Sequence, residues 1–216
     1  MRSGLALGET RAMFQHIARQ MIASQDLLSA ADRAIGDGDH GVGMARGFEA
    51  VLEALEDSSN AVKMLDLKEL FQKVGMALVT SMGGASGIIF GTWFTGGGKA
   101  LAGKTVFDGE AFYNFLESGL KAVQDRGKAK AGEKTMVDAL IPACSAAAEF
   151  HNQDLPEVIQ KAALAAAAGM ENTKQMVATV GKAKTLGQRS LGFADPGAIS
   201  THLILEAMFE YVASLP

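Results

Sequence analysis

The sequence is poor in cysteine and in basic charge, and each shortage excludes a class of protein. A single cysteine, Cys144, among 216 residues excludes an internal disulfide framework and fits a reducing compartment. The apolar neighbourhood of Cys144, residues 141–146, predicts that it is a small residue of the core. The net charge of −4 argues against wholesale nucleic-acid binding, because a basic face is the expected footprint of such proteins.

Long hydrophobic runs are missing as well. No stretch of about 18 apolar residues occurs, so no membrane span is expected. The first eight residues lack the apolar run and cleavage site of a signal peptide, and we therefore expect a cytoplasmic protein. No linker, repeat or shift in composition divides the chain, which predicts one domain over residues 1–216.

Apolar residues recur at helical spacing through most of the chain. One stripe runs from Phe14 to Leu27 and Leu28, others begin at Met44 and Leu67, and further helices are expected near residues 86–100, 109–126, 134–151, 156–173 and 197–214. Strand signals are weak, since the Asp-Gly pairs at 37–38 and 108–109 precede helical patterns instead of joining alternating runs. We predict an all-α fold, a single domain of about eight antiparallel helices in an up-and-down bundle.

An acidic turn at residues 32–41 carries the strongest chemical signal. Asp32, Asp37 and Asp39 lie within eight residues, with Gly36 and Gly38 between them, directly before a helical pattern. Crowded carboxylates are best tolerated around a cation, and Mg²⁺ is usually held by carboxylates together with substrate phosphates. The alternative is a solvated turn in which Asp39 caps the next helix.

Three glycine-rich segments accompany the acidic turn. Residues 80–87 resemble a phosphate-cradling loop without the ending of a Walker A motif, and a tight helix connection is an equal alternative. Residues 125–136 form a charged turn that is typical of a solvated loop. Residues 181–197 are basic and rich in glycine, so they could close as a lid over phosphates or simply connect two helices. His40 could contact a phosphate or cap its turn.

Together these segments resemble one family, the L subunit of dihydroxyacetone kinase and its fused-domain relatives. The matching motifs occur in the order of the family and cover nearly the whole chain: residues 32–41, 83–87 with 90–92, 126–128 with 132–136, 186–192 and 195–198. The resemblance implies an eight-helix antiparallel barrel with ADP or ATP bound at one end.

The resemblance also assigns roles to residues. Asp32, Asp37 and Asp39 would hold two Mg²⁺ ions and, together with Lys182, carry catalysis. The nucleotide would contact His40, Gly41, Ala85, Ser86, Gly127, Met136, Lys182, Asp195, Pro196 and Gly197. Two residues depart from the family pattern: Gly43 stands where asparagine is usual, and Lys182 stands where arginine is common, keeping the charge without the bidentate fork.

The partners follow from the same resemblance. A separate K subunit would hold the ketose, a triose or another small ketose, and the phosphoryl source would be ATP or a phosphohistidine protein of a phosphotransferase system. A homodimer is compatible with the sequence, whereas nucleic acid and membrane partners are not expected. The alternative function is a nucleotide-sensing module that binds a transcription regulator. A helical bundle with a degenerate site is the third possibility.

Overall fold

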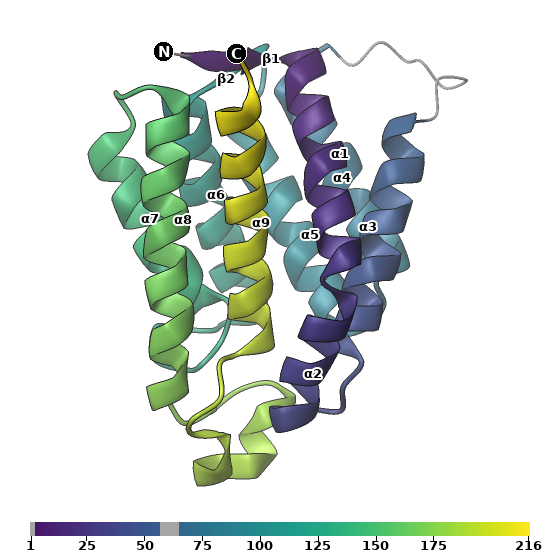
Figure 1. Cartoon of the computed structure of the whole chain (residues 1–216), viewed down its shortest axis with the longest axis vertical. Coiled ribbons are helices and arrows are strands. Elements are labelled where there is room, and N and C mark those ends of the chain that lie inside the picture. Colours follow the sequence, from purple (N-terminus) through teal and green to yellow (C-terminus); the bar gives the residue numbers. More distant parts are fainter. Residues whose placement is uncertain (1–2, 57–64) are drawn as a thin grey trace.

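The computed structural model describes residues 3–56 and 65–216, and these residues are mostly helical (Figure 1). The described α-helices are α1 (Leu7–Ala23), α2 (Gln25–Ile35), α3 (His40–Glu56), α4 (Leu67–Ser81), α5 (Gly84–Lys99), α6 (Gly109–Gly127), α7 (Val137–Phe150), α8 (Leu155–Asn172) and α9 (Pro196–Ser214). Two short 3₁₀ helices, η1 (Thr173–Gln175) and η2 (Lys182–Ser190), lie between α8 and α9.

The helices form a closed up-and-down barrel. From α3 to α9 each helix packs against the next along the chain, and α1 packs against both α3 and α9, which closes the ring. Helix α2 continues α1 beyond the ring after a break at Ser24. Figure 1 shows the helices running alternately up and down, so α3, α5, α7 and α9 all begin at the lower end in that view. This confirms the predicted all-α fold of about eight antiparallel helices.

Aspartate and proline residues fix where several helices begin. The side chains of Asp66 and Asp108 accept hydrogen bonds from the backbone N–H groups three residues onward, at 3.0 and 2.8 Å, which caps α4 and α6. Pro156 and Pro196 lie in the first turns of α8 and α9, where a proline removes no helical hydrogen bond.

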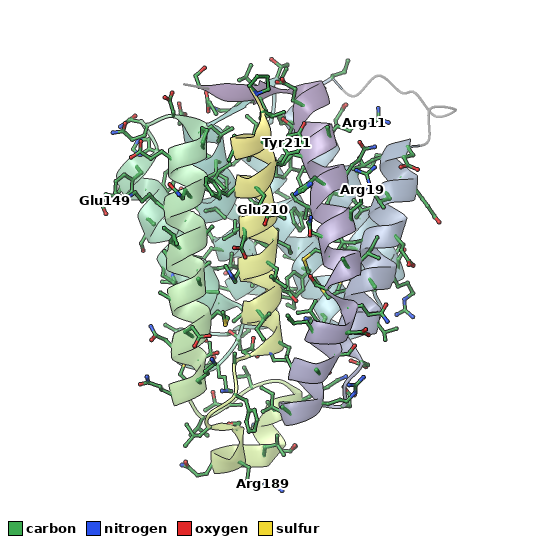
Figure 2. All side chains as sticks on the ribbon, viewed as in Figure 1. Arg11, Arg19, Glu149, Arg189, Glu210 and Tyr211 are labelled. Atoms are coloured by element: carbon green, nitrogen blue, oxygen red, sulfur yellow. The ribbon has the colours of Figure 1, made fainter. Side chains whose placement is uncertain are left out.

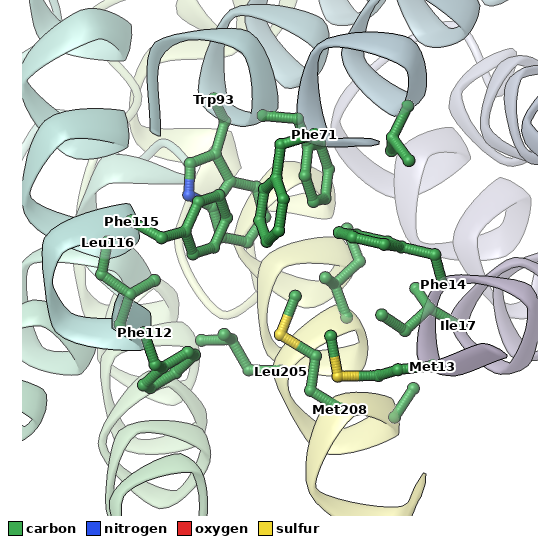
Figure 3. Packing of buried hydrophobic residues seen from close by; sticks show 14 of the residues in the cluster. Met13, Phe14, Ile17, Phe71, Trp93, Phe112, Phe115, Leu116, Leu205 and Met208 are labelled. Atoms are coloured by element: carbon green, nitrogen blue, oxygen red, sulfur yellow. The ribbon is translucent and has the colours of Figure 1, made fainter. Parts of the chain in front are cut away.

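Aromatic side chains fill the interior of the barrel (Figure 3). The rings of Phe14 and Phe71 meet edge to face at 4.8 Å between centroids, and Trp93 stacks on Phe115 at 5.7 Å. These residues come from α1, α4, α5 and α6, so a single core joins elements from both halves of the sequence. The core gives the site at the lower end a rigid frame.

Two strands were not predicted from the sequence. Strand β1 (Gly4–Ala6) pairs antiparallel with β2 (Val106–Asp108), with Leu5 opposite Phe107, at the upper end of the barrel in Figure 1. Each strand has three residues, too few for an alternating pattern, and the pairing joins segments far apart in the sequence. Burial of Leu5 and Phe107 stabilises it.

The burial of individual apolar residues adds detail to the predicted helices. Leu28 is buried on α2 whereas Leu27 is 54% exposed, since Leu28 lies two helical turns after the buried Met21 and Leu27 falls off that face. Cys144 lies on α7, half-buried and packed against the core, which agrees with a structural role. None of the described helices is both long and apolar enough to cross a membrane.

Candidate functional site

A cavity of about 720 Å³ opens at the lower end of the barrel, where four helices begin. Its lining includes the first residues of α3 and α5 and the residues at the starts of α7 and α9. The free backbone N–H groups of a helix N-terminus and the positive end of its dipole attract anions. Four such ends around one cavity make it suited to phosphate groups.

Three carboxylates stand at the edge of this cavity. Asp32 is buried near the end of α2, and the exposed Asp37 and Asp39 follow it in the turn to α3. One oxygen from each of them lies within 4.8 Å of the others. Gly38 has a φ of 81°, a conformation that glycine adopts readily and that turns the chain between Asp37 and Asp39. Three oxygen donors at this spacing fit a hard cation such as Mg²⁺.

Lys182, the first residue of η2, balances these charges. Its Nζ lies 2.7 and 2.6 Å from the two carboxylate oxygens of Asp37 and 2.9 Å from Oδ2 of Asp39. The hydrogen bond from Lys182 lowers the pKa of Asp37, and the bonds to Asp37 and Asp39 raise the pKa of Lys182. The ammonium group therefore stands where positive charge is required next to the carboxylates.

His40 connects the acidic turn to α9. Its backbone N–H donates to Oδ2 of Asp32 at 3.2 Å, and its ring Nε2 lies 2.8 Å from the hydroxyl of Ser200 on α9. Burial lowers the pKa of His40, opposed by the nearby charges of Asp32 and Asp39. His40 is thus held as a neutral ring in the wall of the cavity.

The glycine-rich loop before α5 forms a second wall. Gly83 and Gly84 have φ values of 73° and 63°, which present Ala85 and Ser86 to the cavity at the start of the helix. Arg46 of α3 fixes this loop, because its Nε donates to the carbonyl of Ser81 at 2.6 Å and its guanidinium also contacts the carbonyl of Met82. The loop thus combines a helix N-terminus with a nearby positive charge.

The starts of α7 and α9 form the third wall. Met136, Pro196 and Gly197 line the cavity there. Asp195 caps α9, since its Oδ2 accepts the backbone N–H of Ala198 at 2.8 Å. Burial raises the pKa of Asp195 to about 7, although the Ala198 bond and the charge of Lys134 oppose the rise.

Residues 173–195, which we call the lid segment, join α8 to α9 across the lower end of the barrel (Figure 1). Among its basic side chains, Lys182 reaches the carboxylates, and Lys184 and Arg189 are exposed. Figure 2 shows Arg189 at the tip of this segment, away from the barrel. The segment thus contacts the acidic turn through Lys182.

The structure brings most of the sequence-predicted residues together. Asp32, Asp37, Asp39, His40, Ala85, Ser86, Met136, Lys182, Asp195, Pro196 and Gly197 all line the one cavity. Gly41 and Gly127 lie outside this lining. Gly41 packs against the backbone of α2, and Gly127 ends α6 next to Ile89, which does line the cavity.

Sequence reasoning assigned no role to several other lining residues. Arg46 lacks a recognisable motif, and only its place one and a half turns after His40 puts it near the site. Lys134 and Thr135 belong to the matching motif at residues 132–136, where the sequence predicts a solvated loop. In the structure Lys134 is buried. Ile35 and Ile89 carried only the apolar signal of a core, and Phe90 belongs to a matching motif that gave it no role.

Fold and site together define a closed α-helical barrel whose one end carries a cavity with three clustered carboxylates and the starts of four helices. The sequence profile of the DAK2 domain matches residues 34–210. The ADP-binding subunit DhaL of a PEP-dependent dihydroxyacetone kinase from Listeria innocua is 41% identical over 187 residues, which are 87% of each chain. The corresponding subunit of a PTS-dependent kinase from Lactococcus lactis is 40% identical, over 86% of this chain and 88% of the relative.

A solved structure agrees with these relatives. The dihydroxyacetone kinase from C. freundii, in complex with AMP-PNP and Mg²⁺, superposes with a TM-score of 0.73 at 27% identity. The match covers 97% of this chain and 35% of that longer one. The chain therefore belongs to the DhaL family of DAK2-domain proteins.

Proposed function

We propose that this chain is the nucleotide-binding, phosphoryl-transferring subunit of a kinase that acts on dihydroxyacetone or a related small ketose. One observation carries the proposal: Asp32, Asp37 and Asp39 converge in a cavity that four helix N-termini surround. Carboxylates for a cation and free N–H groups for phosphates are the two halves of a metal–nucleotide site. The names of the relatives supply the reaction class.

Asp32, Asp37 and Asp39 would hold Mg²⁺, and the family resemblance suggests two ions. When bound, Mg²⁺ neutralises phosphate charge and helps to fix the geometry for in-line transfer. The C. freundii kinase was solved in complex with AMP-PNP and Mg²⁺, which supports this ligand pair. Lys182 forms ion pairs with Asp37 and Asp39, so its ammonium would be within reach of a phosphoryl group bound beside these carboxylates.

The remaining residues bind and orient the nucleotide. Ala85 and Ser86 offer backbone N–H groups at the start of α5, and Met136, Pro196 and Gly197 form the opposite wall. His40, kept neutral by burial, can donate or accept a hydrogen bond without adding charge. Gly41 acts indirectly in this proposal, because its lack of a side chain lets α2 and α3 approach each other. Gly127 would contact the nucleotide from outside the lining, next to Ile89, which lines the cavity.

The ketose would be held by a separate K subunit, since the two bacterial relatives matched over most of their length are named as subunits. Their names also specify dependence on PEP or the PTS, which favours rephosphorylation of bound ADP by a phosphohistidine protein over exchange of ATP. All the relatives reported above are named as kinases or kinase subunits, which favours phosphoryl transfer over the sensing of nucleotide for a transcription regulator.

Reconstitution tests the proposal. The purified chain, mixed with a K subunit, dihydroxyacetone and Mg²⁺, should form the phosphorylated ketose when a phosphohistidine donor is supplied, and mass spectrometry of the gently purified chain should find retained ADP. Asp37→Ala should abolish the reaction, and Glu53→Gln, an exposed carboxylate on α3, should not. If neither the phosphohistidine donor nor ATP supports phosphorylation, the proposal is wrong.

A further inference from the structure

Lys134 is unusual among the lysines that the structure describes because it is buried, with an exposed fraction of 2%. Its backbone is left-handed, with a φ of 62°, in the connection between α6 and α7. A buried lysine normally requires a paired charge, because removing an ammonium from water is costly. Within the described residues no carboxylate lies at ion-pair distance, and Nζ instead donates to two backbone carbonyls, those of Thr173 and Phe193, each at 2.6 Å.

The two carbonyls belong to opposite ends of the lid segment. Thr173 directly follows α8, where its carbonyl lies at the negative end of the helix dipole, and Phe193 lies two residues before Asp195. Two more hydrogen bonds join the two ends of the lid segment, which together form its neck. Gly192 N–H donates to the carbonyl of Lys174 at 2.8 Å, and Asp195 N–H donates to the hydroxyl of Thr173 at 2.9 Å. The buried ammonium of Lys134 thus holds together the two segments that leave the barrel, and we call this pair of hydrogen bonds the clasp.

The clasp also connects the lid segment to the cavity wall. Lys134 immediately precedes Thr135 and Met136, which line the cavity at the start of α7. In the middle of the lid segment, Lys182 contacts Asp37 and Asp39. A shift at the neck would therefore move Lys182 relative to the carboxylates while leaving Asp32, Asp37 and Asp39 on their own elements.

We propose that Lys134 is a positioning residue that holds the neck of the lid segment closed and thereby places Lys182 over the site of phosphoryl transfer. It acts through the lid segment, because the two hydrogen bonds of its ammonium go to backbone carbonyls of that segment. The inference rests on the proposed function for its catalytic consequence, whereas the closed neck itself is a property of the chain alone.

Hydrogen exchange followed by mass spectrometry tests the clasp without nucleotide or partner. Lys134→Met keeps the length of the side chain and removes the charge and the donors. Amides of residues 174–195 should exchange about 10- to 100-fold faster in this variant, since a hydrogen bond from a charged donor is among the stronger ones. Lys130→Met, an exposed residue of the same connection, should leave their exchange unchanged. Unchanged exchange in Lys134→Met would overturn the clasp.

A double-mutant cycle tests positioning separately. Lys134→Met should lower the rate of phosphoryl transfer about 10-fold or more but add little in a Lys182→Met background, because residues that act as one unit are not additive. ADP affinity in the presence of Mg²⁺ should change by less than the rate. Equal losses of rate and affinity, or additive losses in the double variant, would show that Lys134 does not act through Lys182.

If Lys134→Met fails to fold, Thr173→Val replaces it, since valine removes the hydroxyl that accepts the Asp195 N–H and donates to the carbonyl of Met170. The same amides should then exchange faster, by a smaller factor, and unchanged exchange would contradict a neck held closed by these hydrogen bonds. Absence of phosphoryl transfer in the unmodified chain would contradict the proposed function while leaving the exchange result on the neck intact.

Discussion

Adding one methyl group at Gly41 tests how closely the acidic turn depends on helix packing. Gly41 lies in the first turn of α3, against α2. A Cβ there would lie 2.6 Å from the backbone nitrogen of Ser29 and closer still to the carbonyl oxygen of Gln25. Backbone atoms cannot rotate away, so Gly41→Ala must move α2 away from α3.

The magnitude follows from two opposing effects. Overpacking costs about 3 kcal/mol at the upper end of its usual range, because backbone atoms receive the clash. Alanine restores about 1 kcal/mol of helix propensity. The net loss of roughly 2 kcal/mol corresponds to a fall in Tm of about 4–8 °C for a chain of this length. The hydrogen bond from the His40 N–H to Asp32 crosses the same contact, so ADP binding in the presence of Mg²⁺ should weaken too.

Gly43→Ala is the matched control. Gly43 lies two residues further along α3, and a Cβ there would have its nearest neighbour, the carbonyl oxygen of Met82, at 3.5 Å, which is ordinary contact. This variant should be about 0.5–1 kcal/mol more stable than the unmodified chain. Calorimetry gives the Tm of both variants, and urea unfolding gives their free energies of unfolding. Equal stabilities for the two alanine variants would refute the account of the α2–α3 contact.

Three further predictions concern charge and protonation. Asp37→Ala should abolish Mg²⁺-dependent ADP binding in a calorimetric titration, and binding close to that of the unmodified chain would contradict its assignment as a metal ligand. Because burial raises the pKa of Asp195 from 3.8 to about 7, the folded chain binds more protons than the unfolded one between these values, and the stability that Asp195 contributes is lost as the pH rises through this window. The free energy of unfolding of Asp195→Asn, relative to that of the unmodified chain, should therefore rise by on the order of 3 kcal/mol between pH 3.8 and about 7. A stability difference that stays constant over this range in urea unfolding would contradict the raised pKa. Burial raises the pKa of Cys144 to about 11, so its alkylation at pH 8 should be about 100-fold slower in the folded chain than in guanidinium, and equal rates would contradict its burial.

The fold was predictable because most helices carry a complete local signal. Helix α8, for example, begins with a proline in its first turn and continues through alanine-rich sequence, and both features act within a few residues. Strands β1 and β2 escaped prediction because their pairing depends on residues a hundred positions apart. That residues 1–216 form a single domain stays a prediction.

The site was predictable where side chains declare their chemistry and less so where backbone geometry decides. Asp32, Asp37 and Asp39 stood out because carboxylates so close together need compensation. Lys134 looked like part of a charged, solvated turn, since no local pattern reveals that its ammonium reaches two carbonyls 39 and 59 residues further along the chain. The contact of Lys182 with Asp37 is equally non-local, and only the family resemblance pointed to it.

Titration of ADP into the purified chain, with Mg²⁺ and then with EDTA in its place, tests the central claim most directly. A cavity that joins three carboxylates to four helix N-termini should bind ADP at one site per chain with Mg²⁺ present and lose that binding in EDTA. Absence of binding under both conditions, or binding that is equally strong in EDTA, would contradict the metal–nucleotide site.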